Sequence, residues 1–171
     1  MILWINLVSD GLPALALGVD PMEPDLMKHP PRPRGESFFA RQLGARIVIR
    51  GLALGWLAYF IFDRSLDRGF GLRYAETMAF ATLIFGQLWH IFDARSFTTL
   101  YQKNPFENRY LILAVLCSGL LSVTMIYTPF GNFALGTEPL SMRHLFMLMF
   151  LAALPTLGLS AIRAVFRLRF L

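Results

Sequence analysis

Three polar side chains that could bind a cation stand close together near the start of the chain. Asn6, Ser9 and Asp10 lie in the stretch NLVSDGLPALALGVDP, which is otherwise apolar, at relative positions 0, +3 and +4. On an α-helix this spacing puts all three on one face. An ionisable residue at membrane depth costs about 2.5–3.5 kcal/mol on the insertion scale, and by default it indicates a functional site. The cluster therefore predicts a polar, inward-turned site in a first membrane helix.

Two helix breakers, Gly11 and Pro13, follow Asp10 directly. Pro13 has no amide hydrogen, so it predicts a break between Asp10 and Pro13 that exposes backbone carbonyls near the carboxylate. Carboxylate, amide and hydroxyl oxygens suit Ca²⁺, Mg²⁺, Na⁺ or K⁺ rather than zinc or copper. The alternative interpretation is a polar seam that only joins helices.

A fourth candidate ligand, Gln87, lies in the later stretch LIFGQLWHIFD, with His90 one turn on. We interpret His90 as an interface residue that is hydrogen-bonded to a neighbour. Asn6, Ser9, Asp10 and Gln87 supply five side-chain oxygens at most, whereas Ca²⁺ takes about 6–8. A complete site therefore requires ligands from other helices.

The elements that must position these residues are predicted to be membrane helices. The chain has 171 residues, of which 56% are hydrophobic and only 16% charged, and its mean hydropathy is +0.52. Long uncharged runs approach the ~20 residues that cross a bilayer. They predict an all-α membrane protein in which a broken first span is followed by two helical hairpins. The five spans are expected at about 2–19, 46–63, 75–92, 109–128 and 144–162, with a proline-rich connection at 20–45.

The net charge of +5 is interpreted as a signal of topology. Twelve basic residues fall in the connections after spans one and three and in the tail, and four fall in the other two loops. By the positive-inside rule this predicts an outer amino terminus and a cytoplasmic carboxyl terminus. The same distribution argues against nucleic acid as a partner.

Other chemistries find little support. The single cysteine, Cys117, lies within a span, so no disulfide framework is possible. The histidines His29, His90 and His144 are too far apart in sequence to suggest a zinc motif. The opening has no basic leader and is not expected to be a cleavable signal peptide.

Small residues and proline indicate how the helices pack. Gly51 and Gly55 form a GxxxG pair in RGLALGW, a pattern that lets another helix approach closely. Glycine is also common in membrane helices generally, and the pattern alone leaves both interpretations open. Pro155 in AALPTLGLS is expected to kink span five as a feature of shape.

The stretch WINLVSDGLPALALGVDPMEPDLMKHPPRP resembles the sixth transmembrane helix and following cytoplasmic loop of P-type ATPases. It is most similar to the calcium pumps of bacteria and of the sarcoplasmic-reticulum type. The likeness continues more weakly through TMAFATLIFGQLWHIFDARS to LPTLGLSAIRAVFRLRF. The resemblance implies that the chain is the carboxyl-terminal membrane part of such a pump, with helices six to ten, in a bacterial plasma membrane.

The resemblance also implies roles for single residues. Asn6 and Asp10 match the asparagine and aspartate that coordinate the transported ion, and Ser9 stands where many members have threonine. Gln87 stands where two-ion pumps have glutamate, which suggests one Ca²⁺ per cycle. Gly51 and Gly55 match glycines that pack against the family's fifth helix.

The phosphorylation motif DKTG and any glycine-rich phosphate loop are missing from the 171 residues. The resemblance therefore implies no ATPase activity for this chain alone, and Mg²⁺ and ATP would act only through other domains. The implied partners are helices one to five, the cytoplasmic domains and membrane lipid, so the chain would be a fragment or one half of a split pump. The alternatives are a stand-alone membrane protein with a structural or regulatory role, and a small channel or carrier.

Overall fold

The computed structural model describes residues 1–21, 43–95 and 107–166, and every regular element within those ranges is helical. The predicted all-α membrane fold is confirmed. In chain order the elements are α1 (Ile2–Trp4), the π-helix η1 (Ile5–Asp10), α2 (Gly11–Leu17), α3 (Leu43–Asp67), α4 (Leu72–Ala94), α5 (Arg109–Tyr127), α6 (Pro129–Leu135), α7 (Met142–Leu151) and α8 (Leu154–Phe166). Most of the proline-rich connection predicted at 20–45 lies outside the described residues.

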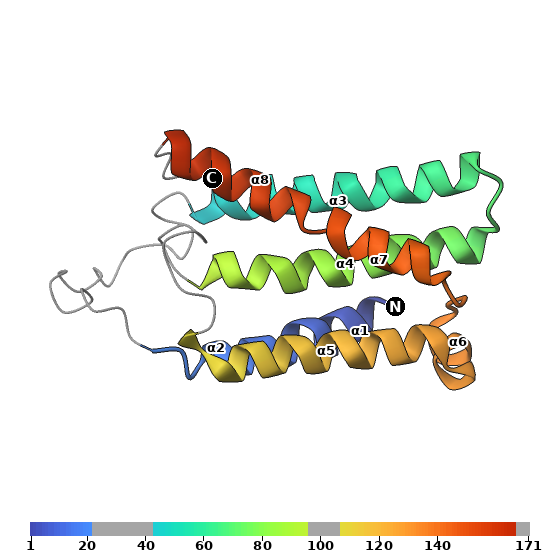
Figure 1. Cartoon of the computed structure of the whole chain (residues 1–171), viewed down its shortest axis with the longest axis horizontal. Helices are drawn as coiled ribbons and strands as arrows, with labels where there is room; N and C mark the ends of the chain where they lie inside the picture. Colours follow the sequence, from blue (N-terminus) through green and yellow to red (C-terminus); the bar gives the residue numbers. More distant parts are fainter. Residues whose placement is uncertain (22–42, 96–106, 167–171) are drawn as a thin grey trace, which may run out of the picture.

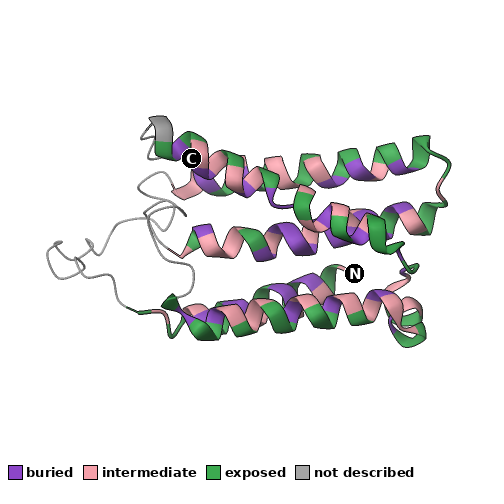
Figure 2. Cartoon of the chain, viewed as in Figure 1, coloured by how far each residue is buried: buried purple, intermediate pink, exposed green. Residues whose placement is uncertain are grey.

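The long helices run side by side, with α4 in the middle of the bundle (Figure 1). Helix α4 contacts α3, α5, α7, α8 and η1, whereas the segment α1–η1–α2 lies against α5. Eleven of the 23 residues of α4 are buried, against five of the 25 in α3, and the buried positions follow α4 along its length (Figure 2). The hydrophobic core is therefore built around α4.

Three helices are long and apolar enough to cross a membrane: Leu43–Asp67, Arg109–Tyr127 and Met142–Ala164. The segment Ile2–Leu17 is apolar but shorter, and α4 is long enough but contains no stretch as apolar as those in these three. A helix surrounded by protein has little contact with lipid, so it can carry more polar residues without loss. The predicted count of five spans thus remains a prediction.

The first helix is not broken at Asp10–Pro13 as the sequence suggested. Residues Ile5–Asp10 form a π-helix, and the α-helix resumes at Gly11 and continues through Pro13 to Leu17. A π-helical stretch uses i→i+5 hydrogen bonds and is found frequently at functional sites. The helix therefore accommodates the proline, which lacks an N–H, by a change from π-helical to α-helical spacing. An unwound segment was expected at this place.

The fifth predicted span consists of two helices. Helix α7 ends at Leu151, two turn residues follow, and α8 begins at Leu154. Pro155 is the second residue of α8, a position at which its missing N–H removes little hydrogen bonding. The kink expected from Pro155 is therefore present, and it lies just before the proline.

A short helix that the sequence analysis did not predict, α6, follows α5. Thr128 caps it by accepting a hydrogen bond from the Gly131 N–H at 3.2 Å, and Pro129 occupies its first position. It ends at Gly136, whose φ of +67° is left-handed and favours glycine. Gly131 lies against the Met125 backbone, and any side chain there would collide with it. The chain thereby turns sharply before it enters α7.

Candidate cation site

The three predicted ligands of the first helix do not share one face. Asn6 and Asp10 are exposed, whereas Ser9 is buried, with only 1% of its surface accessible. The physical reason is the π-helix. With i→i+5 hydrogen bonding each turn holds more residues, so the side chain three positions after Asn6 is rotated away from it. The expectation of a single polar face, drawn from α-helical spacing, is wrong for Ser9.

Asn6 and Asp10 lie on the side of the helix that no other part of the described chain covers. Their neighbours on it, Leu3, Leu7 and Leu15, are 83%, 76% and 76% exposed. Asp10 has no hydrogen bond or ion pair with any described residue. The side chains of Asn6 and Asp10 are thus turned outward from the bundle. The expectation from the sequence was that they face inward among the helices of a complete assembly.

Two of the predicted ligand oxygens are buried, one on η1 and one on α4, and these two helices contact each other. The Oγ of Ser9 and the Oε1 of Gln87 are buried, and neither has a hydrogen-bond partner within the described part of the chain. An unsatisfied polar group in a membrane interior costs several kcal/mol, so such oxygens call for a ligand or a neighbouring donor. Both are hard oxygen donors of the kind that alkali and alkaline-earth ions bind. Of the four predicted residues, Asn6 and Asp10 are thus exposed, whereas Ser9 and Gln87 each have a buried side-chain oxygen.

The described residues hold no group of three or more His, Cys, Asp or Glu that could bind a metal by themselves. One carboxylate with an amide, a hydroxyl and a second amide is an incomplete shell for a divalent ion. Within the ranges that the structure covers, the chain can therefore supply part of a cation site, and the remaining ligands must come from elsewhere.

His90 does not belong to this group. The Arg50 guanidinium donates a hydrogen bond from Nη1 to His90 Nδ1 at 3.0 Å. Arginine has no acceptor atom, so Nδ1 must be the unprotonated ring nitrogen and Nε2 carries the hydrogen. The interpretation of His90 as a hydrogen-bonded interface residue is confirmed.

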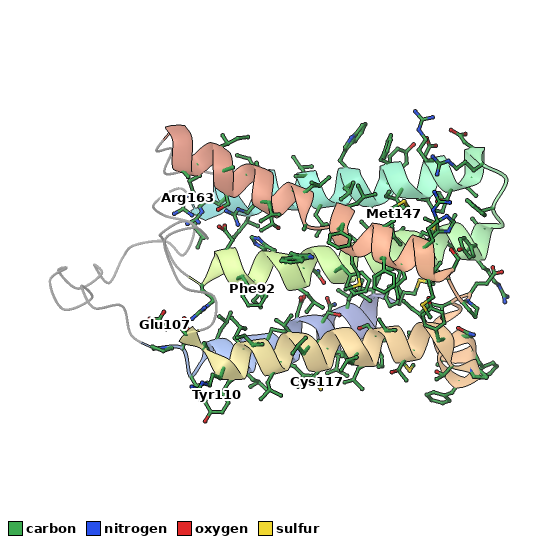
Figure 3. The ribbon with its side chains drawn as sticks, in the orientation of Figure 1. Phe92, Glu107, Tyr110, Cys117, Met147 and Arg163 are labelled. Carbon is green, nitrogen blue, oxygen red and sulfur yellow. The ribbon has the colours of Figure 1, made fainter. Side chains whose placement is uncertain are left out.

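A buried ionic cluster joins α3, α4 and α8, and the sequence analysis missed it. Arg50 forms an ion pair with Asp93, and Ser160 Oγ donates to the other Asp93 oxygen at 2.8 Å. Arg46 and Arg163 are also buried and interact electrostatically with this carboxylate. Figure 3 shows Arg163 at the end of the bundle where α3 begins. The available signal was one charge, Arg50, inside the apolar run at 46–63 and another, Asp93, directly after the run at 75–92.

A second polar cluster fixes the end of the first helix. Arg95 pairs with Asp20 through two bonds, at 2.7 and 3.3 Å, and Asn108 Nδ2 donates to Asp20 Oδ1 at 2.8 Å. Asn108 also donates to the Ala16 carbonyl at 3.0 Å and caps α5 by accepting from the Leu111 N–H. No local pattern connects these residues, because they lie about 75 to 90 positions apart in the sequence.

The GxxxG pair is open in this chain. Among the described residues, a β-carbon on Gly51 or Gly55 would meet no atom within 4 Å beyond its own stretch of helix. The close approach between α3 and α4 is instead made at Gly86 of α4, where the Leu54 side chain fills the space that a β-carbon would need. Gly86 was not singled out from the sequence. Gly51 and Gly55 therefore lie on a face of α3 that further protein can approach.

A bundle of apolar helices whose first helix turns a carboxylate and an amide away from the bundle is a membrane domain suited to pack against further helices. Residues 1–165 match the family described as "Cation transporting ATPase, C-terminus", and the chain belongs to that family. This confirms the resemblance to P-type ATPases. The chain is the carboxyl-terminal membrane region of a cation pump.

Similar proteins are much longer than this chain. A calcium-transporting ATPase of Bacillus subtilis (strain 168) is 52% identical over 132 residues, which is 75% of this chain and 14% of the relative. Calcium-transporting ATPase 1 of Bacillus cereus is 35% identical over 90% of this chain and 19% of the relative. Calcium-transporting ATPase type 2C member 2 of Mus musculus is 34% identical over 89% of this chain and 16% of the relative. The chain thus spans less than one fifth of the length of these relatives.

Proposed function

We propose that the chain supplies one half of an intramembrane Ca²⁺ site in an ATP-driven pump. Asn6 and Asp10 would be the outward ligands, and Ser9 and Gln87 would contribute the two enclosed oxygens. Helices one to five and the cytoplasmic domains of the pump would bring the remaining ligands, together with the ATP and Mg²⁺ chemistry. The relatives' names, which specify calcium transport, support the choice of ion.

The observation that carries this proposal is the exposed, unpaired carboxylate of Asp10 on an apolar helix. Facing lipid, it would cost about 2.5–3.5 kcal/mol. Packed against helices that bring further oxygens and a cation, the same carboxylate becomes a ligand and its charge is neutralised. The open Gly51 and Gly55 face gives a partner helix a second place to approach.

The charge of the ligand set supports a single ion. Asp10 is the only acidic residue among the four proposed ligands, and Gln87 is neutral where two-ion pumps carry a glutamate. Two divalent ions would place four positive charges against this one carboxylate and whatever the missing helices supply. We therefore propose one Ca²⁺ per cycle, a cytoplasmic carboxyl terminus and an outer amino terminus for the assembled pump in a bacterial plasma membrane.

The test joins the full 171-residue chain to the amino-terminal part of the Bacillus subtilis relative, in place of the matching region. Ca²⁺-dependent ATPase activity and Ca²⁺ uptake are measured in inverted membrane vesicles. We expect the chimaera to be active and Asp10→Asn to abolish both signals while the amount of protein stays the same. Asp63→Asn neutralises an exposed carboxylate near the carboxyl end of α3. It serves as the control and should retain activity.

Two results would overturn the assignment. If Asp10→Asn transports as well as the unchanged chimaera, Asp10 is not a ligand. If the chimaera is inserted and folded but shows no Ca²⁺-dependent activity, a structural or regulatory role of this chain becomes the better explanation.

A further inference from the structure

The carbonyl of Val8 lies near the point where η1 passes into α2. At the i→i+5 spacing of η1, the residue that would donate to Val8 is Pro13. Proline has no N–H, so that bond cannot form. An unsatisfied carbonyl inside a membrane is costly, because no water is present to replace the donor. At the π spacing, the Val8 carbonyl therefore needs a donor from outside the helix.

Ser118 of α5 provides that donor. Its Oγ donates to the Val8 carbonyl at 2.7 Å, and the Ser118 side chain is fully buried. In a helix, a serine hydroxyl commonly bonds to a carbonyl of its own preceding turn. Ser118 instead bonds across to a residue 110 positions away. The neighbouring Cys117, labelled in Figure 3, is exposed, so only one of these two adjacent side chains faces the first helix.

The Ser118 bond is the middle one of three between α5 and the first helix. Trp4 Nε1 donates to Ser122 Oγ at 3.1 Å at one end, and Asn108 donates to the Ala16 carbonyl at the other. Of the three, only the Ser118 bond reaches the π segment itself, two residues before Asp10. The outer two fix where the helix lies, and the middle one acts on its pitch.

We propose that Ser118 is a positioning residue for the cation site. Its hydroxyl takes the place of the missing Pro13 N–H, and it thereby holds the π turn that directs Asn6 and Asp10 outward while Ser9 stays enclosed. Without the bond, the segment relaxes toward α-helical spacing, and the ligand oxygens turn relative to one another. This inference rests on the proposed function, because it concerns the geometry of that same site.

The first test measures the hydrogen bond itself and does not depend on transport. Val8–Ser9 is the one Val–Ser pair in the sequence. Labelling valine carbonyls with ¹³C and serine amides with ¹⁵N therefore gives a single NMR cross-peak that reports on the Val8 carbonyl. In the full chain in detergent micelles, Ser118→Ala should shift the Val8 carbonyl resonance toward the value of an unbonded carbonyl. Ser118→Thr and Cys117→Ala should leave it in place, and an unmoved resonance in Ser118→Ala would overturn the proposal.

The second test asks whether the bond acts on the site. In the active chimaera, Ser118→Ala should raise the Ca²⁺ concentration for half-maximal ATPase activity about 3- to 10-fold, the loss expected for one hydrogen bond between membrane helices. Activity at saturating Ca²⁺ should be retained, which a general loss of folded protein would not give. Ser118→Thr should restore the affinity, and Ser122→Ala should leave it unchanged. An unaltered Ca²⁺ affinity in Ser118→Ala, or an equal change in Ser122→Ala, contradicts the proposal.

Pro13→Ala makes the test specific, because it restores the backbone N–H. In that background the Ser118→Ala change should have a clearly smaller effect on Ca²⁺ affinity. If Ser118→Ala lowers the affinity equally with and without Pro13→Ala, the Ser118 hydroxyl does not replace the missing Pro13 N–H. If Ser118→Ala does not accumulate, Ser118→Cys retains the volume with a weaker donor and should show an intermediate shift. An inactive parent chimaera would count against the proposed function alone, since the NMR experiment decides the Ser118 bond without it.

Discussion

Removing the carboxylate of Asp93 should destabilise the bundle more than any other single charge neutralisation among the described residues. Asp93 is 1% exposed and Arg50 is 8% exposed, and the two are paired. In Asp93→Asn the Arg50 guanidinium remains buried without its counter-charge, and Ser160 loses a charged acceptor. Breaking a buried pair in this way costs about 3–5 kcal/mol.

The loss can be measured by unfolding the full chain in mixed micelles with increasing SDS and following tryptophan fluorescence. Arg64 and Asp67 provide the control, since they form a pair on the same helix α3 at 3.7 Å with about 60% of each side chain exposed. Such a pair contributes about 0–1 kcal/mol, so Asp67→Asn should change little. The double variant Arg50→Met with Asp93→Leu should recover part of the lost stability, because apolar residues of similar size replace the buried pair. Recovery is incomplete because buried Arg46 and Arg163 also interact with the Asp93 carboxylate.

Two results would refute this reasoning. If Asp93→Asn and Asp67→Asn have the same small effect, the buried pair does not hold the helices together. If the double variant is as unstable as Asp93→Asn, the unpaired charge of Arg50 is not the cause of the loss.

Three further predictions concern helix packing. Gly51→Leu and Gly55→Leu should leave the unfolding of the isolated chain unchanged, because no atom lies near either position, but should prevent co-purification with a separately expressed amino-terminal half. Gly86→Val should cost about 1–3 kcal/mol in the same unfolding assay by overpacking against Leu54. Adding Leu54→Ala should restore part of the loss. A Gly86→Val chain that is as stable as the unchanged chain would contradict the close contact. Asn108→Ala should cost about 1–2 kcal/mol through the lost helix cap and its bonds to the first helix, whereas Asn108→Asp, which keeps the capping oxygen, should lose less.

The architecture was predictable from the sequence because hydrophobic length is a local signal. The runs that became α3, α5 and α7–α8 are long and apolar, and the structure makes helices of all three. Helix α6 was missed although its signals are also local. Thr128 before Pro129 is a helix start, and Gly136 is a helix end, but the surrounding polar residues suggested a loop.

The geometry of the site was less predictable because it depends on distant residues. Asp10, Gly11 and Pro13 are typical of a broken helix, and the sequence could not show that Ser118 would supply a donor from another helix. With a donor from outside the helix, a π turn can form without unwinding, and Ser9 rotates away from Asn6. The pairing of Arg50 with Asp93 was hidden for the same reason, since it depends on how two helices are turned toward each other.

The central position of α4 has a consequence for how the protein reaches the membrane. During synthesis each segment meets the translocon in turn, and α4 is the long described helix that lacks a stretch apolar enough to favour transfer into lipid by itself. It is joined to the more apolar α3 by a tight turn that contains Gly69, and its polar groups Thr77 and Thr82 bond to carbonyls of its own helix. We therefore expect α3 and α4 to leave the translocon together as a hairpin, so that α3 shields α4 until α5 and α7 arrive to enclose it.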